Sequence, residues 1–386
     1  MQITCLKLKN WRNFREVDVP LEPRTYLIGA NASGKSNFLD VFRFLRTLAQ
    51  TDGGGLQRAM KDRGGLTKLR SLHARNDPEV RIAVDLSDVD QGQRRLWRYV
   101  LALKAEGKGQ QRVLVSEERV ECDGRTLLAR PDAKDRGDVE RRTQTHLEQI
   151  GSNASFRALA DHFAGTTYLH LVPQLLKHGD EIGARIPEND PFGQGLMQRI
   201  AKTPKKTRDA RLRRIQQALA QAVPLFSELR FEQDPVTGLW HLEANFTHWR
   251  AHGGWQRENQ FSDGTLRLIG LLWALQEGEG LLLLEEPELS LNDAIVAHLP
   301  LLIERVLRDR KKRVSSRQVL ISTHSEALLQ SADDATVLLV EPSANGSSVR
   351  TPDADELAQI QHGLTPAEVL LPKTRPQAIE QIGLGG

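Results

Sequence analysis

The sequence predicts an α/β fold with a mixed central sheet, an antiparallel β layer and an inserted, mainly helical region. Three observations lead to this prediction. A glycine-rich loop at residues 29–36 stands between an apolar strand pattern and a helical pattern. Short β-rich runs separated by turn residues follow between residues 79 and 128. The segment 138–228 reads mostly as helix, after which strand and helix patterns alternate to about residue 345.

The composition indicates a globular protein rather than a disordered one. The chain has 386 residues, of which 39% are hydrophobic and 27% charged. It contains no apolar run of the roughly 18 residues that a membrane span needs, and its N-terminus lacks the pattern of a secretion signal. We therefore expect a cytoplasmic protein without a membrane partner. Cys5 and Cys122 have no neighbouring ligand residues, so neither a zinc site nor a disulfide framework is expected.

The N-terminal part is expected to combine strands with one helix. Strand patterns at 3–8 and 25–28 are separated by a turn-like segment at 10–14. The helical pattern over 37–48 has apolar residues at three- and four-residue spacing and is followed by three glycines at 53–55. The β-rich runs of the antiparallel layer cover 80–86, 96–103, 113–115 and 126–128.

The rest of the chain begins with the mainly helical segment. An apolar stretch at 168–172 and a Gly/Pro-rich stretch at 179–195 interrupt it, and no heptad repeat indicates a coiled-coil arm. The elements expected after it are a strand at 239–246, a helix at 264–275, a strand at 281–284, a helix at 293–308 and a strand at 318–321. The tail after about 345 shows one short helical stretch and little core of its own.

The loop at 29–36 is a complete GxxxxGK[ST] motif. Its glycines let backbone N–H groups and the start of the next helix point at a polyphosphate. Lys35 would reach the β and γ phosphates, and the Ser36 hydroxyl would help to hold Mg²⁺. A glycine-rich turn that happens to contain Lys and Ser is the alternative, but it does not account for the order of strand, loop and helix. The residues expected to contact the nucleotide here are Asn31, Ala32, Ser33, Gly34, Lys35, Ser36 and Asn37.

A second motif follows at 281–287, where four leucines precede two glutamates and a proline. A carboxylate at the end of a buried strand, beside a phosphate loop, can hold the Mg²⁺ shell, and a second can orient the water that attacks the γ phosphate. We expect Glu285 to contact the metal and Glu286 to act as the general base. For this segment alone, an acidic turn that closes a core strand is the alternative. Together the two motifs predict an ATPase with ATP and Mg²⁺ as cofactors.

Three further segments resemble motifs of a known protein family. They are Trp11-Arg12-Asn13-Phe14, Phe261-Ser262-Asp263-Gly264-Thr265 and Ser322-Thr323-His324-Ser325. With them the chain resembles the ABC-type ATPase heads of the group that contains Rad50, SMC, RecF and the OLD-like ATPases, and in detail the compact prokaryotic AAA_21-type ATPases. The resemblance implies an ABC-type P-loop NTPase head. We divide the chain into an N-terminal ATPase lobe (1–137), the inserted helical region (138–228), a C-terminal ATPase lobe (229–345) and a tail (346–386).

The resemblance also implies roles for single residues. Ser262 and Gly264 would cap the γ phosphate held by another subunit, which implies a homodimer or a larger homo-oligomer formed through the ATP site. His324 resembles the switch histidine and joins Lys35 and Glu286 as a catalytic residue. The segment 290–292 occupies the D-loop position. Gln174 is implied as the Q-loop ligand of the metal, although several glutamines are candidates. Arg12 and Asn13 are implied to lie near the phosphates.

These segments have structural alternatives, and they depart from the family pattern. A Ser-Asp-Gly-Thr run is usually a turn and helix cap, and a histidine after a strand is often structural. Asp263 stands where transporters commonly have Gly, Glu285 where Asp is commoner, and 292–293 replaces the usual residues after the D-loop. Slow or partner-activated hydrolysis therefore remains open. Asp263 would repel the γ phosphate unless another group compensates for its charge.

We infer the partners from two basic stretches of the sequence and from the family resemblance. Clustered cations can bind DNA without sequence preference, but each stretch can equally be a solvated surface. Resemblance to DNA-repair and phage-defence ATPases favours DNA, with a separate effector such as a nuclease, because too few residues follow Glu341 for a Toprim domain. A transporter subunit and a weakly hydrolysing ATP-bound scaffold are the alternatives. The stretches comprise Lys202, Lys205, Lys206, Arg208, Arg211, Arg213 and Arg214, and Arg305, Arg308, Arg310, Lys311, Lys312, Arg313 and Arg317.

Overall fold

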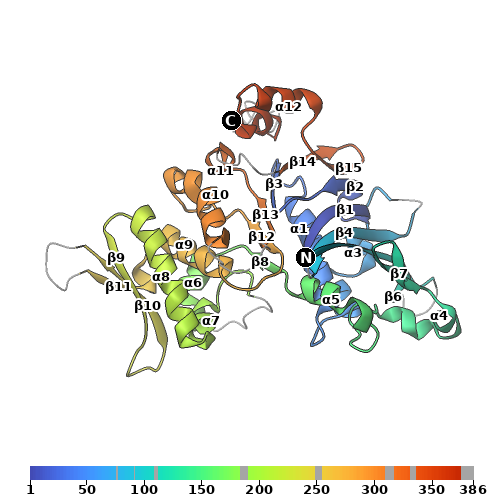
Figure 1. The fold of residues 1–386 in the computed structure, drawn as a ribbon, viewed down its shortest axis with the longest axis horizontal. Coiled ribbons are helices and arrows are strands. Elements are labelled where there is room, and N and C mark those ends of the chain that lie inside the picture. Colours follow the sequence, from blue (N-terminus) through green and yellow to red (C-terminus); the bar gives the residue numbers. More distant parts are fainter. Residues whose placement is uncertain are drawn as a thin grey trace, which may run out of the picture.

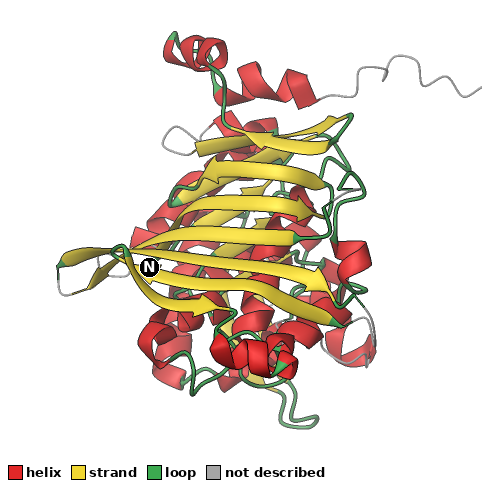
Figure 2. Cartoon of the chain, turned by 90° about the vertical axis from the view of Figure 1, so that its right-hand side faces the viewer, coloured by secondary structure: helices red, strands yellow, loops and turns green. Residues whose placement is uncertain are grey.

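A long mixed sheet runs through the molecule, with helices packed on it (Figures 1 and 2). The computed structural model describes residues 1–74, 77–90, 92–107, 112–182, 190–247, 254–308, 317–330 and 336–374. The twelve strands of this sheet follow the order β7-β6-β5-β4-β1-β2-β15-β14-β3-β13-β12-β8, and a second sheet has the order β11-β10-β9. Across the described ranges, every helix is too short or too polar to cross a membrane.

One half of the long sheet is parallel. Its strands are β8 (Thr167–Leu169), β12 (Leu282–Glu285), β13 (Val319–Ser322), β3 (Arg24–Gly29) and β14 (Thr336–Ser343). The register sets Glu285 opposite Ser322 and Ser322 opposite Leu27. The carboxyl ends of β12, β13 and β3 therefore meet at one edge, where ligands bind in open parallel sheets.

The other half is antiparallel and confirms the predicted β layer. Its strands are β1 (Gln2–Trp11), β2 (Phe14–Pro20), β4 (Val80–Asp90), β5 (Gln93–Ala105), β6 (Val113–Cys122) and β7 (Arg125–Arg130). Strand β2 was not expected, although Val17 and Val19 are buried and alternate with exposed residues. The charged residues between these apolar residues made the strand pattern unclear in the sequence.

The central strands are buried on both faces, which explains their nearly continuous apolar sequences. Leu27 of β3 packs in one core, while its neighbours Tyr26 and Ile28 pack in the other. The first core includes residues of α1 (Lys35–Ala49), α2 (Leu56–Lys61), α3 (Leu66–Leu69) and α5 (Arg157–Ala164). The second includes residues of α9 (Asp263–Leu275), α10 (Asp293–Arg308) and α11 (Glu326–Gln330).

The segment 138–228 is largely helical, as expected. It contains η1 (Val139–Thr143), η2 (Ala154–Phe156), α5, β8, α6 (Pro173–Ile182), α7 (Leu196–Lys202) and α8 (Lys205–Ala222), and a short helix, α4 (Ala133–Gly137), precedes it. Helix α8 packs against the small sheet of β9 (Phe226–Gln233), β10 (Trp240–Phe246) and β11 (Trp255–Arg257), which η3 (Glu258–Gln260) follows (Figure 1). Only the middle strand of that sheet was predicted.

The tail contributes more to the fold than its sequence indicated. Strand β15 (Gly346–Arg350) pairs with β14 and bridges to β2, so it joins the two halves of the long sheet. The elements after it are α12 (Ala354–Gln361), α13 (Pro366–Leu370) and η4 (Leu371–Thr374). Val369 and Leu370 of α13 are buried in the second core. The expectation of one short helix with little core was therefore wrong for this segment.

Candidate functional site

The glycine-rich loop links the end of β3 to the start of α1, as its motif predicts. Gly34 has φ 116° and Ala32 has φ 61°, both in the left-handed region. A Cβ atom at Gly34 would lie 2.1 Å from Nδ2 of Asn13, and one at Gly29 would lie 2.3 Å from the carbonyl oxygen of Val340. Both glycines are therefore required by close packing around the loop.

Lys35 and Ser33 turn polar groups toward the inside of this loop. Nζ of Lys35 donates hydrogen bonds to the carbonyl oxygens of Gly29 at 2.9 Å and Ala30 at 3.1 Å. Burial lowers the pKa of Lys35, against the opposing effect of three nearby glutamates led by Glu286. Oγ of Ser33 is buried and has no hydrogen-bond partner among the described residues. The loop thus combines a buried cation with an unused hydroxyl.

Asn13 forms a hydrogen bond with the loop, whereas Arg12 pairs with Asp40 of α1. Nδ2 of Asn13 donates to the carbonyl oxygen of Ser33 at 2.8 Å, and its Oδ1 accepts from Asn37 at 2.8 Å. Arg12 donates to Asp40 of α1 at 2.9 Å. Burial would raise the pKa of Asp40, but the guanidiniums of Arg63 and Arg12 outweigh burial and lower it. The structure therefore ties Arg12 to the helix behind the loop.

The predicted metal-binding pair lies together. Oγ of Ser36 donates a hydrogen bond to Oε1 of Glu285, and the hydroxyl of Tyr168 donates to Oε2 at 2.5 Å. Nδ1 of His170 lies 3.3 Å from the carbonyl oxygen of Glu285. Sequence reasoning missed Tyr168 and His170, whose only signal was two polar-tipped side chains in the apolar stretch at 168–172.

Glu286 and His324 face each other beside this pair. Oε1 of Glu286 lies 3.6 Å from Nε2 of His324. Glu286 has φ 46°, a left-handed conformation rarely adopted by a non-glycine residue, and its N–H donates to the carbonyl oxygen of Ser322 at 2.9 Å. Burial and the charge of Lys35 lower the pKa of His324, although Glu286 opposes them. The neutral imidazole is thereby favoured.

Glu288 and Arg267 support this pair, and sequence reasoning gave neither a role. Oε1 of Glu288 accepts hydrogen bonds from Oγ1 of Thr323 at 2.5 Å and from the backbone N–H of His324 at 3.2 Å. Arg267 is only 4% exposed and donates to the carbonyl oxygen of Glu286 at 3.0 Å. A lone arginine in the otherwise apolar helix 264–275 was the available signal.

The Ser-Asp-Gly-Thr segment begins helix α9. Oγ of Ser262 accepts a hydrogen bond from the N–H of Thr265 at 3.1 Å and so caps the helix. A Cβ atom at Gly264 would lie 2.5 Å from the carbonyl oxygen of Ser290, in the D-loop segment. In the described part of the chain, no hydrogen bond joins Ser262 or Gly264 to the loop at 29–36.

Gln174 lies against this segment rather than against the metal-binding pair. Its Nε2 donates to Oδ2 of Asp263 at 3.1 Å, and Nζ of Lys177 lies 2.5 Å from Oδ1 of the same carboxylate. Among the described contacts, none connects Gln174 with Ser36 or Glu285. Its role as a metal ligand stays a prediction.

The basic stretches differ in accessibility. In the first, Lys202, Lys205, Lys206, Arg213 and Arg214 are exposed. Two others cover aromatic rings instead: the guanidinium of Arg208 lies 4.9 Å from the ring centre of Trp240, and that of Arg211 lies 5.2 Å from that of Trp273. In the second, Arg305 is exposed, whereas Arg317 is buried and donates to the carbonyl oxygens of Ala274 and Gly280. The Arg308 side chain and Arg310, Lys311, Lys312 and Arg313 lie outside the described residues.

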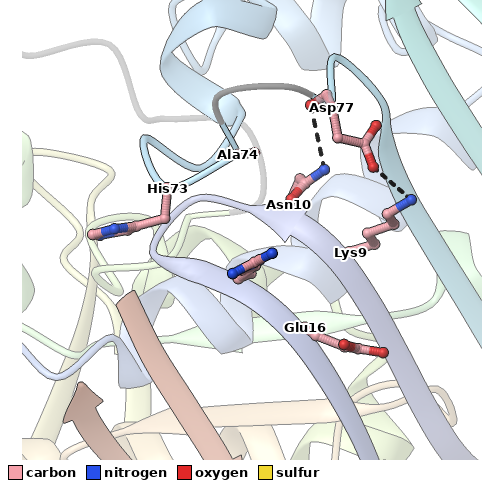
Figure 3. A pocket seen from close by; sticks show the side chains of 7 residues that line it. Lys9, Asn10, Glu16, His73, Ala74 and Asp77 are labelled. Carbon is pink, nitrogen blue, oxygen red and sulfur yellow. Dashed lines mark hydrogen bonds and ion pairs between the residues drawn. The ribbon is translucent and has the colours of Figure 1, made fainter. Parts of the chain in front are cut away.

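A cavity of about 320 Å³ lies on the antiparallel half, beside the turn between β1 and β2 (Figure 3). Two of the polar side chains that line it have close partners. Nζ of Lys9 lies 2.6 Å from Oδ2 of Asp77, and Nδ2 of Asn10 donates to the carbonyl oxygen of Glu79 at 2.8 Å.

The donor set at the loop fits a polyphosphate with Mg²⁺. Lys35 supplies a cation, Ser33 an unpaired hydroxyl, and the loop leads into the start of a long helix. Ser36 and Glu285 present hydroxyl and carboxylate oxygens side by side, and oxygen ligands are those that Mg²⁺ prefers.

Comparison with known proteins agrees with this geometry. Residues 24–330 match the AAA_21 family, described as "AAA domain, putative AbiEii toxin, Type IV TA system". The DNA replication and repair protein RecF of Gloeobacter violaceus is 36% identical over 84 residues, 22% of this chain. RecF of Chlamydia caviae is 46% identical over 46 residues, 12% of this chain. The matched segments span 19% and 12% of the length of these two relatives.

Solved structures share the fold over most of the chain. An SMC head bound to the C-winged helix domain of ScpA has a TM-score of 0.55 and 17% identity, covering 93% of this chain and 100% of that chain. The SMC head domain from Thermotoga maritima has a TM-score of 0.51 and 15% identity, covering 92% and 100%. The chain therefore belongs to the AAA_21 family, and it shares its fold with SMC heads.

Proposed function

We propose that this protein is an ATP-binding and ATP-hydrolysing switch that dimerises head to head around ATP. The observation that carries the proposal is the convergence of Lys35, the Ser36–Glu285 pair and the Glu286–His324 pair at one edge of the parallel strands. Each of these groups has a separate task in phosphoryl transfer.

The residues divide the work as follows. The loop N–H groups and Lys35 hold the phosphates, and Ser36 and Glu285 hold Mg²⁺, which neutralises charge on the phosphates when it is bound. Gln174 is proposed as a further metal ligand through its amide oxygen, since its Nε2 donates to Asp263. Oε1 of Glu286 accepts a proton from the attacking water, and His324, whose Nε2 lies 3.6 Å from that oxygen, contacts the γ phosphate.

The position of Ser262 and Gly264 supports the proposed dimer. Ser262 is exposed, and both residues stand at the N-terminal end of α9, which favours anions. We propose that they meet the γ phosphate held by a second copy. ATP then binds the closed dimer better than the separated heads, and hydrolysis removes that difference.

We propose that the switch works in the cytoplasm on DNA, in repair or antiphage defence, with a separate effector such as a nuclease. The RecF relatives are named as DNA replication and repair proteins, and α8 carries an exposed basic face. A weakly hydrolysing, ATP-bound scaffold is the second candidate, because Asp263 and Glu285 replace the commoner residues.

The solution mass of the Glu286→Gln variant, measured by light scattering with and without ATP and Mg²⁺, tests the switch. We expect ATP to double the mass, and Lys35→Ala in the same background to prevent the doubling. An unchanged mass with ATP would contradict the ATP-linked dimer. An ATP-driven dimer of the wild-type chain that persists without phosphate release would favour the scaffold.

A further inference from the structure

Two side chains of helix α6 bind Asp263, the acidic residue of the Phe261–Thr265 segment, which we call the signature segment. Nζ of Lys177 lies 2.5 Å from Oδ1 of Asp263, and Nε2 of Gln174 donates to Oδ2 at 3.1 Å. Gln174 and Lys177 are three residues apart, so they lie on one face of the helix. The Lys177 side chain is 16% exposed and that of Asp263 is 37% exposed, so the ion pair is partly shielded from water. Both oxygens of the carboxylate are therefore occupied.

Asp263 presents an electrostatic difficulty in the proposed dimer. It stands between Ser262 and Gly264, the two residues assigned to the γ phosphate of the second copy. A carboxylate at that place would repel a triphosphate, since like charges at close range disfavour each other. Within the described ranges, Lys177 is the cation that forms an ion pair with Asp263. The nearest arginine of α9, Arg267, is directed to the carbonyl oxygen of Glu286 instead.

We propose that Lys177 is a positioning residue that neutralises Asp263 and thereby allows the signature segment of one copy to approach the triphosphate of the other. This inference rests on the proposed function. Gln174 completes the arrangement because it holds the second carboxylate oxygen and keeps the ion pair in one orientation. Lys177 is thus required for association of the heads and not for nucleotide binding by a single head, which uses the loop at 29–36.

A charge-rescue experiment in the Glu286→Gln background tests the inference. The variants are Lys177→Ala, Asp263→Asn and their combination, and Lys134→Ala serves as control because Lys134 is an exposed lysine on α4 in the antiparallel half. Dimerisation with ATP and Mg²⁺ is measured by light scattering over a range of protein concentrations. Binding of a fluorescent ATP analogue to dilute protein reports the single head.

We expect Lys177→Ala to weaken ATP-dependent dimerisation by about tenfold, because it exposes the triphosphate to an unpaired carboxylate. Nucleotide binding by the single head stays unchanged. When Asp263→Asn is added to Lys177→Ala, the double variant dimerises to within about twofold of Asp263→Asn alone, because residue 263 then carries no negative charge to compensate. The defect of Lys177→Ala also shrinks as salt is raised, because salt screens an exposed charge but not a packing defect.

Two results would overturn the inference: wild-type dimerisation by Lys177→Ala, or a double variant as defective as Lys177→Ala. The second result, with a lowered melting temperature and no salt dependence, would assign Lys177 to the packing of α6 on α9. If the parent Glu286→Gln chain itself fails to dimerise with ATP, the proposed function falls and this inference falls with it.

Discussion

The hydroxyl of Tyr168 donates a 2.5 Å hydrogen bond to Oε2 of Glu285, while Ser36 binds Oε1 of the same carboxylate. Strands β8 and β12 are parallel neighbours, and this pairing brings Tyr168 to the end of the leucine strand. Burial raises the pKa of the Tyr168 hydroxyl, so it remains a donor at neutral pH. Glu285 is one methylene longer than the commoner aspartate, and Tyr168 restricts where that longer side chain can point.

Tyr168→Phe should therefore weaken the use of Mg²⁺ without abolishing nucleotide binding. The ring remains in place, but one hydrogen bond to a charged group is lost, which is worth about 1.5–3 kcal/mol at most. We expect ATP hydrolysis to fall by roughly three- to tenfold and the Mg²⁺ concentration for half-maximal activity to rise. Tyr99→Phe is the matched control, because it removes a hydroxyl that bonds Glu118 in the antiparallel half. Equal Mg²⁺ dependence of the two variants would contradict the role of Tyr168.

Variants in the two halves of the proposed ATP site should lose different steps of the reaction. Lys35→Ala removes the buried cation of the loop and should abolish nucleotide binding. Glu286→Gln keeps the shape of the site but loses the proton acceptor, so it should bind ATP and lose about 10²–10⁴-fold in turnover. Fluorescent-nucleotide binding and phosphate release measure the two steps separately. Wild-type hydrolysis by both variants would refute the assignment.

The sequence predicted those parts of the site whose spacing is local. The loop, Glu285 and the histidine after β13 each follow a strand, and the parallel register then aligns the strand ends. Tyr168 lies 117 residues before Glu285, and Lys177 lies 86 residues before Asp263. Nothing in one sequence connects such distant positions, because their contact depends on which strands become neighbours.

The same reason explains the differences in the fold. Strand β15 reads as part of a tail, yet it pairs with β14 and joins two halves of the sheet. The helix at 293–308 was predicted with its observed bounds, since its apolar periodicity is contained within the segment. Elements with an apolar periodicity within their own residues were predictable from the sequence. Strands that form only through pairing with distant strands were not.

The exposed basic face of α8 should bind DNA in a salt-dependent way. Lys205, Lys206, Arg213 and Arg214 are exposed on this helix. Replacing these four with glutamine should lower DNA affinity and reduce the slope of log K against log salt by up to about 0.9 per lost phosphate contact. Fluorescence anisotropy with duplex DNA at several salt concentrations measures both effects.

Lys134→Gln provides a control for that experiment, since Lys134 is an exposed lysine on α4 that belongs to neither basic stretch. It should change DNA affinity much less than the four replacements do. An affinity that is unchanged by the α8 replacements would mean that these residues only face solvent.

We expect the free energy of unfolding to fall as the pH decreases from 6.5 toward 4, because His146 stays neutral in the folded protein over this range. Burial, aided by the charge of Arg130, lowers the pKa of His146 from 6.5 to about 4. In the unfolded chain the same histidine takes up a proton near pH 6.5. Between these values the unfolded state binds more protons than the native state, so the free energy of unfolding rises with pH and is lost as pH falls from 6.5 toward 4.

His146→Gln should therefore reduce the loss of stability between pH 7 and pH 5 by about 1 kcal/mol, after allowance for partial exposure of the ring. Urea denaturation of the wild type and the variant at both pH values measures the difference. His162→Gln should act in the same direction, because burial lowers the pKa of His162 to about 4 as well. Parallel pH dependence of all three proteins would show that protonation of these histidines does not limit the acid stability of the fold.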